Sequence, residues 1–112
     1  MMLNTGSDMK LSKSKLLSTI GYQIDGKVSY ALEGSIFMAG ASVQWLRDNL
    51  EFLSSSTEIE NLAKNSNKNS NVSFIPAFTG LGAPYWDPEA RGAIFGLSRE
   101  TTKNDISQAL LE

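Results

Sequence analysis

The spacing of apolar and polar residues changes along the chain, and the change predicts both strands and helices. Residues 15–24 and 27–32 are strand-like runs on either side of Asp25-Gly26. A type I′ turn needs positive φ at both of its central positions, so Asp-Gly between two such runs predicts a β-hairpin. Between residues 35 and 52 the apolar side chains recur at steps of three and four, which predicts the clearest helix of the chain.

The second half of the chain alternates between polar segments and short apolar runs. Residues 54–71 are rich in serine and asparagine, which predicts an exposed loop, and only the stretch 59–63 within them has helical spacing. The apolar runs at residues 72–75 and 93–97 predict two short strands, and residues 1–3 resemble the tail of another.

The C-terminal residues carry a signal for the start of a helix. Thr102 and Asp105 have the spacing of a capping box, which predicts a helix from about residue 103. A carboxylate in the first turn also interacts favourably with the helix dipole. Strands and helices in this order indicate an α/β or α+β domain.

A segment rich in glycine and proline, residues 78–92, connects two of the predicted strands. Large apolar residues, among them Phe78, Tyr85 and Trp86, separate its turn-forming residues and have area to bury. We therefore expect an ordered loop that packs on a sheet and leads into a strand. Ordered loops of this kind often line functional sites.

The only charged residues of this loop are Asp87, Glu89 and Arg91. The two carboxylates could act as an acid/base pair or hold a metal ion. Asp87 also stands between Trp86 and Pro88, where aspartate commonly organises a turn, and Arg91 is close enough in sequence to pair with one carboxylate. The structural interpretation is the favoured one.

Gly40 and Gln44 lie one turn apart on the same face of the predicted main helix. A glycine inside a helix costs about 1 kcal/mol relative to alanine, so its presence needs a reason. Either another helix or a ligand approaches closely there, and in the second case the Gln44 amide could bind that ligand. From spacing alone, helix packing is the favoured explanation.

The composition excludes several classes of function. A net charge of −2 argues against binding to the phosphate backbone of nucleic acid. The chain has no cysteine and no histidine, so it contains no disulfide, thiolate or histidine chemistry. It has no apolar run of membrane-spanning length and no signal-peptide pattern, so we expect a cytoplasmic protein. Both ends look abrupt, and a part of a larger domain is expected.

Three blocks of sequence resemble the FGGY carbohydrate kinase family. They are residues 30–48 (YALEGSIFMAGASVQWLRD), residues 76–97 (PAFTGLGAPYWDPEARGAIFGL) and residues 92–112, which are similar to the second signature of that family. The resemblance covers nearly the whole chain and is weakest in residues 54–71. Within the family, the string FMAGASVQW at residues 37–45 is most similar to the glycerol kinases.

The resemblance implies a partial α/β domain of the actin-like ATPase (ribonuclease H-like) fold, from the start of the family's second domain. The implied reaction transfers the γ-phosphoryl group of ATP to a terminal hydroxyl of glycerol, with Mg²⁺, and gives glycerol 3-phosphate. On the family pattern Gly40 and Gln44 match nucleotide-binding positions, which reverses the preference for helix packing. The loop 78–92 is expected to shape the cleft and to contribute no catalytic residue.

The family's glycerol-binding residues, its catalytic aspartate and two further nucleotide-binding segments have no match in this chain. We therefore expect a kinase fragment that is inactive alone and binds ATP weakly or not at all. The expected partners are ATP, glycerol and the missing kinase half, or further copies of the chain. The alternative is a non-catalytic remnant or a small interaction domain from a split or decayed kinase gene.

Overall fold

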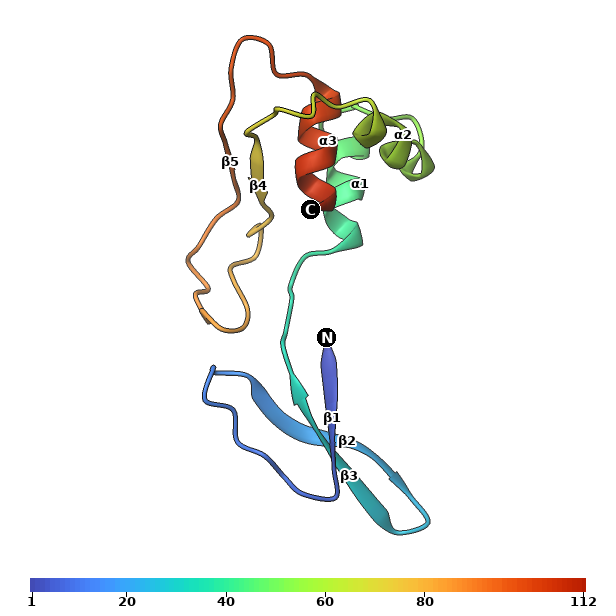
Figure 1. The fold of residues 1–112 in the computed structure, drawn as a ribbon, viewed down its shortest axis with the longest axis vertical. Coiled ribbons are helices and arrows are strands. Elements are labelled where there is room, and N and C mark those ends of the chain that lie inside the picture. The colour runs from blue at the N-terminus through green and yellow to red at the C-terminus, as the bar shows by residue number, and fades with distance from the viewer. The chain divides into compact units, whose positions relative to one another are not determined.

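A computed structural model describes residues 1–112, and the chain forms two compact units (Figure 1). The first unit comprises residues Met1–Phe37 and Thr79–Ala90. The second unit comprises Met38–Phe78 and Arg91–Glu112. No helix in either unit has both the length and the apolar character needed to cross a lipid bilayer.

The first unit is built on a three-stranded antiparallel sheet in the order β1-β3-β2 (Figure 1). Its strands are β1 (Met2–Gly6), β2 (Leu17–Ile24) and β3 (Lys27–Glu33). The edge strand β1 extends to Gly6, further than the three residues at the start of the chain from which the strand was expected.

The hairpin between β2 and β3 confirms the sequence prediction. Ile24 pairs with Lys27, and only Asp25 and Gly26 lie between them. Their φ angles are 49° and 76°, as a type I′ turn requires. The turn therefore sets the register of the two longest strands from Ile24 back to Tyr22, and an irregularity between Ile20 and Tyr22 shifts it beyond that point.

Both faces of this sheet carry exposed apolar side chains. Cross-strand partners point to the same face, so Leu3 and Ile20 lie with Leu32 and Tyr30 on one face, and they are 65% and 60% exposed. Ile24, paired with Lys27, is 62% exposed on the other face. Apolar side chains on both faces are typical of sheets that are covered on both sides in α/β proteins.

The glycine- and proline-rich loop is ordered, as expected. The backbones of Leu81 and Asp87 exchange two hydrogen bonds, at 2.8 and 3.0 Å. The Asp87 carboxylate accepts hydrogen bonds from the backbone N–H groups of Glu89 and Ala90, at 2.9 and 3.1 Å. Asp87 thus organises a turn, which confirms the structural interpretation of this residue.

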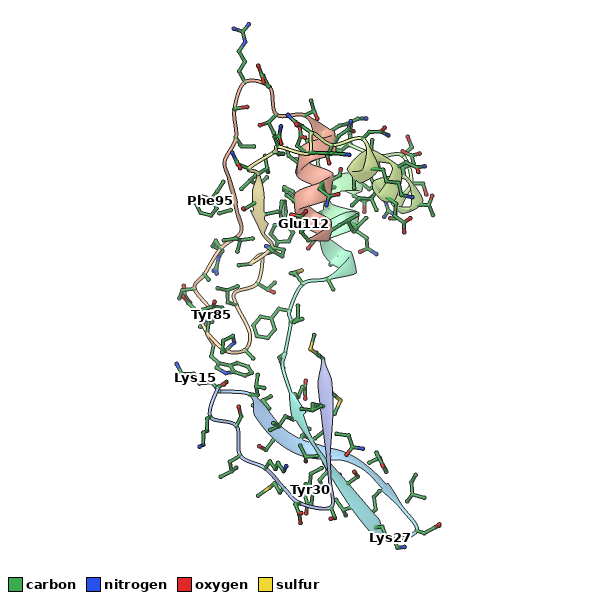
Figure 2. The ribbon with its side chains drawn as sticks, viewed as in Figure 1. Lys15, Lys27, Tyr30, Tyr85, Phe95 and Glu112 are labelled. Atoms are coloured by element: carbon green, nitrogen blue, oxygen red, sulfur yellow. The ribbon has the colours of Figure 1, made fainter.

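The two aromatic residues at the tip of this loop are more exposed than the sequence suggested. Tyr85, which Figure 2 labels, is 69% exposed, and Trp86 is 37% exposed. Trp86 is held by a polar contact, because its indole N–H donates to the carbonyl oxygen of Lys15 at 2.7 Å. The sequence indicated that both rings have area to bury, and the Tyr85 ring does not bury most of it within this chain.

The second unit packs helices beside a two-stranded antiparallel sheet (Figure 1). Leu46, Leu53 and Ile59 form its fully buried core, and Ile106 and Leu110 pack against them. The elements are α1 (Gly40–Asp48), η1 (Ser56–Glu58), α2 (Ile59–Lys64), β4 (Ser73–Ile75), β5 (Ala93–Phe95) and α3 (Lys103–Leu111).

The predicted helix 35–52 is shorter in the structure, where α1 spans Gly40–Asp48. At its C-terminal end, the N–H groups of Asn49 and Leu50 both donate to the carbonyl oxygen of Trp45, and Glu51 adopts a φ of 54°. A left-handed residue stops a right-handed helix. The spacing of apolar residues predicted too long a helix at this end, because Leu50 still packs on the core after α1 has ended.

The polar segment 54–71 contains more helix than expected. Ser56–Glu58 forms a 3₁₀ turn that leads into α2, and Ile59 and Ala63 bury the apolar face that the spacing indicated. Residues 54–55 and 65–71 are irregular.

Candidate functional site

One face of α1 is open to solvent. Gly40, Ala41, Gln44 and Asp48 are all exposed, and their spacing places them along one side of the helix. A Cβ atom added to Gly40 would meet no atom of the chain within 4 Å. No other helix of the chain packs against Gly40, so the explanation favoured from spacing alone does not apply within this chain. The backbone at Gly40 is open to the approach of a ligand.

The N-terminus of α1 has no capping group of its own. Its N-cap residue is Ala39, which offers no side-chain acceptor, and the first turn contains no acidic residue. The partial positive charge of the free N–H groups is therefore not offset by the side chains of the helix. An anionic group of a ligand would be stabilised at this end.

The opposite side of α1 is firmly anchored. Leu46 is fully buried, and the Trp45 ring lies 5.0 Å from the ring of Phe78 and 6.0 Å from that of Phe74. Aromatic pairs at these separations contribute about 0.5–1.5 kcal/mol beyond their burial. The open face that carries Gln44 is thus held on a packed support. On the buried side the Ser42 hydroxyl has no hydrogen-bond partner, which lowers the stability of this packing.

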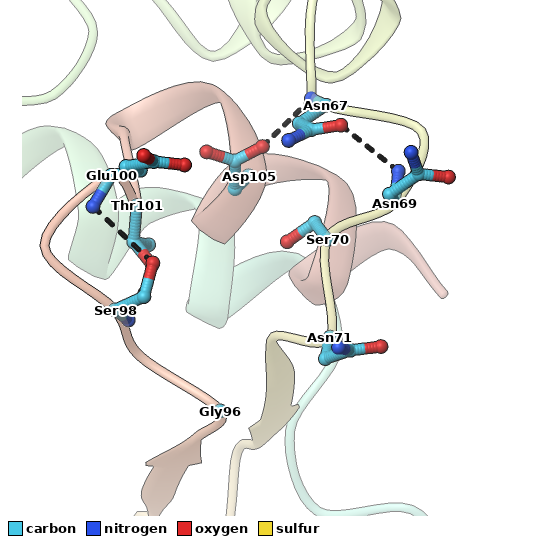
Figure 3. A pocket seen from close by; sticks show the side chains of 9 residues that line it. All are labelled: Asn67, Asn69, Ser70, Asn71, Gly96, Ser98, Glu100, Thr101 and Asp105. Atoms are coloured by element: carbon cyan, nitrogen blue, oxygen red, sulfur yellow. Dashed lines mark hydrogen bonds between the residues drawn. The ribbon is translucent and has the colours of Figure 1, made fainter.

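A second candidate is a polar pocket in the second unit, shown in Figure 3. It lies between residues 67–71 and residues 96–101, over the first turn of α3. The asparagine- and serine-rich run in the sequence was the signal for one wall, but nothing in the sequence placed that run opposite the turn at residues 98–101.

Asp105 joins these two parts of the chain. One carboxylate oxygen accepts a hydrogen bond from the Asn67 backbone N–H at 2.7 Å. The other accepts from the backbone N–H of Thr102 at 2.8 Å and from its hydroxyl at 2.7 Å, which confirms the predicted capping box. These donors, the Thr102 N–H first among them, hold the pKa of Asp105 below its ordinary value.

Replacing Asp105 by asparagine is expected to lower the stability of the chain near neutral pH. The pKa of Asp105 in the folded state lies below its unfolded value of about 3.9. The stability that this carboxylate contributes is therefore fully present above the unfolded pKa, and it is lost as the pH falls from there through the folded-state pKa. The wild-type advantage over Asp105→Asn should therefore shrink as the pH is lowered from about 7 to about 3. Thermal melts across this range, with Asp25→Asn as the control, measure it. An advantage that does not change with pH would contradict this role.

The carboxylates of the glycine- and proline-rich loop are not grouped with other acidic side chains. The Asp87 carboxylate is engaged in its own turn, and no group of three or more acidic side chains is placed to hold a metal ion. The pairing of Arg91 with one of these carboxylates stays a prediction.

The fold and the open helix face together define an α/β domain in which one face of α1 is exposed. The family described as the FGGY family of carbohydrate kinases, C-terminal domain, matches residues 1–112. The chain belongs to this family, and it has part of the actin-like ATPase fold, as its sequence predicted.

Three relatives illustrate this similarity. The chain is 58% identical over 110 residues to a glycerol kinase of Enterococcus faecalis and 56% identical over 110 residues to one of Ligilactobacillus salivarius. The crystal structure of Plasmodium falciparum glycerol kinase with ADP superposes with a TM-score of 0.84 at 38% identity. Each match covers 98% of this chain but only 22% of the relative.

Proposed function

We propose that this chain is part of the nucleotide side of a glycerol kinase, which transfers the γ-phosphoryl group of ATP to glycerol and gives glycerol 3-phosphate and ADP. The observation that carries the proposal is the open face of α1. Gly40 leaves the backbone accessible, and Gln44 offers an amide one turn further along. The similarity to a glycerol kinase described with ADP supports a nucleotide as the ligand.

The role proposed for Gly40 and Gln44 is binding and positioning, since phosphoryl transfer depends mainly on orientation and electrostatics. The phosphates, which are anionic, would be favoured near the uncapped start of α1, and Gln44 would hydrogen-bond the nucleotide from the same face. We assign no catalytic residue to the chain.

The reaction of the family uses Mg²⁺, so the acidic side chains on the open face of α1 are the candidates to hold it. Mg²⁺ is usually bound by one or two carboxylates together with substrate phosphates. On the open face of α1 the only carboxylate is that of Asp48, and both of its oxygens accept hydrogen bonds from Arg47, at 2.6 and 2.9 Å. These residues do not fit a magnesium site, and none of them is assigned to it.

The chain is proposed to act as a part of a larger kinase. It spans 22% of the length of the glycerol kinases that it matches. The exposed apolar side chains on both faces of the β1-β3-β2 sheet support coverage by further protein, whether the other kinase half or a second copy. A cytoplasmic location is proposed with this function.

A chimera tests the proposal. This chain replaces the aligned segment of the Enterococcus faecalis glycerol kinase, to which it is 58% identical. We expect the chimera to phosphorylate glycerol with ATP, and the 112-residue chain alone to release no ADP above a protein-free blank. A coupled assay for ADP measures both.

The result distinguishes the kinase from the non-catalytic alternative. A folded chimera without activity would show that this segment no longer supports the reaction, as in a remnant. Circular dichroism and thermal melting of the chimera separate this outcome from simple misfolding. Activity of the isolated chain would contradict the view that it supplies only part of the site.

A further inference from the structure

The Trp45 ring links two groups of apolar side chains in the second unit. It packs on the buried core of that unit, and it also contacts the rings of Phe74 and Phe78, which lie outside the core cluster. Trp45 directly follows Gln44 in α1. The placement of its ring therefore bears on the helix face proposed for the nucleotide.

The rotation of α1 about its own axis decides where its open face points. The two buried residues of this helix, Ser42 and Leu46, are four apart and so lie along one line. Contacts along a single line resist rotation only weakly. The Trp45 ring adds support to one side of that line, at 5.0 Å from the ring of Phe78 and 6.0 Å from that of Phe74. These aromatic contacts therefore fix the direction of the open face.

Phe78 is itself held firmly. Its backbone N–H donates to the carbonyl oxygen of Pro76 at 2.9 Å, and its ring meets that of Phe74 edge-on, at 6.2 Å and 85°. The ring also fills the space that a side chain at residue 92 would need. A Cβ atom on Gly92 would lie 3.0 Å from two atoms of the Phe78 ring and 3.1 Å from the carbonyl oxygen of Ile75. The φ of Gly92 is not positive, so close packing of the ring is what requires glycine here.

Phe78 and Gly92 are the two ends of the glycine- and proline-rich loop, so the base of this loop is packed against the helix through Trp45. We propose that Phe78 is a positioning residue for the nucleotide: its ring, fitted against Gly92, supports Trp45 and thereby orients the open face of α1. The inference rests on the proposed function, because it places the nucleotide on that face. Phe78 itself acts through Trp45 and does not touch the ligand.

Steady-state kinetics of the chimeric kinase test the proposal. Phe78→Leu removes the ring that supports Trp45, and Gly92→Ala adds a methyl group that displaces this ring. Each variant should raise the KM for ATP about three- to tenfold and leave the kcat and the KM for glycerol within about twofold. The double variant should have a KM for ATP no higher than that of Phe78→Leu alone, because leucine leaves room for the methyl group.

Phe52→Leu is the matched control. Phe52 is also half-buried and packs on the same core, but it makes none of the ring contacts of Trp45. This variant should lower the melting temperature and leave the KM for ATP within about twofold. Calorimetric titration with ADP gives the same comparison of all variants without turnover.

Two outcomes would overturn the proposal. The first is a lower melting temperature with an unchanged KM for ATP in Phe78→Leu and Gly92→Ala, which would leave Phe78 a role in packing only. The second is a double variant in which the two effects multiply, since the residues would then act independently. If Phe78→Leu unfolds the chimera, Gly92→Ala alone decides. A chimera that responds to Gly40→Ala but not to changes at residues 78 and 92 contradicts this inference and leaves the proposed function intact.

Discussion

Replacing Gly96 by alanine is expected to destabilise the second unit by about 2–5 kcal/mol. Gly96 has a φ of +75°, a left-handed conformation that costs an alanine about 1–2 kcal/mol. An alanine Cβ would also overlap the carbonyl oxygen of Asn71, and overpacking against backbone costs about 1–3 kcal/mol more. Since small domains are stable by about 5–15 kcal/mol, this loss is a large fraction of the whole.

Urea denaturation followed by circular dichroism measures the effect. Gly6→Ala is the matched control, because Gly6 has a φ of +78° but open space where the Cβ would lie. The control should show only the cost of the backbone angle, about 1–2 kcal/mol. If the two variants lose the same stability, the close approach of residues 71 and 96 does not hold in solution.

Replacing Gly40 by alanine is expected to have two opposite effects. Gly40 is the first residue of α1 and its φ is not positive, so alanine should stabilise the chain by about 0.4–1 kcal/mol, because it lowers the entropy of the unfolded state and its Cβ would meet no atom of the chain. In the chimeric kinase the replacement should also weaken nucleotide binding by about tenfold or more, because a methyl group on the open face prevents close approach to the backbone. A gain in stability with a loss of affinity is difficult to explain by misfolding.

Gly34→Ala is the matched control for this prediction. Its Cβ would make only ordinary contact with Leu16, at 3.7 Å, and it lies outside α1. It should change neither nucleotide affinity nor glycerol affinity. If both alanine variants weaken ATP binding equally, the effect does not come from the face of α1.

Local chemistry explains which parts of the fold could be predicted from the sequence. The hairpin at Asp25-Gly26 and the capping box at Thr102 and Asp105 depend on a few neighbouring residues, and both are confirmed. The length of α1 was missed because Leu50 keeps the helical spacing after the helix has ended. Periodicity reports which residues face the core, and it does not report the backbone conformation that brings them there.

The candidate sites depended more on tertiary structure. The four-residue spacing placed Gly40 and Gln44 on one helix face, but only the three-dimensional structure shows that this face is open. The polar pocket joins segments that lie about 30 residues apart in sequence, so no local pattern could predict it. The exposure of Tyr85 was missed for a similar reason, since burial of an aromatic ring depends on neighbours that are distant in sequence.

The most direct test of the account is the ATP dependence of the chimeric kinase with and without Gly40→Ala. The account predicts that the KM for ATP rises about tenfold or more, while the KM for glycerol stays within about twofold and the melting temperature does not fall. An unchanged KM for ATP in a folded, active chimera would contradict the placement of the nucleotide on α1.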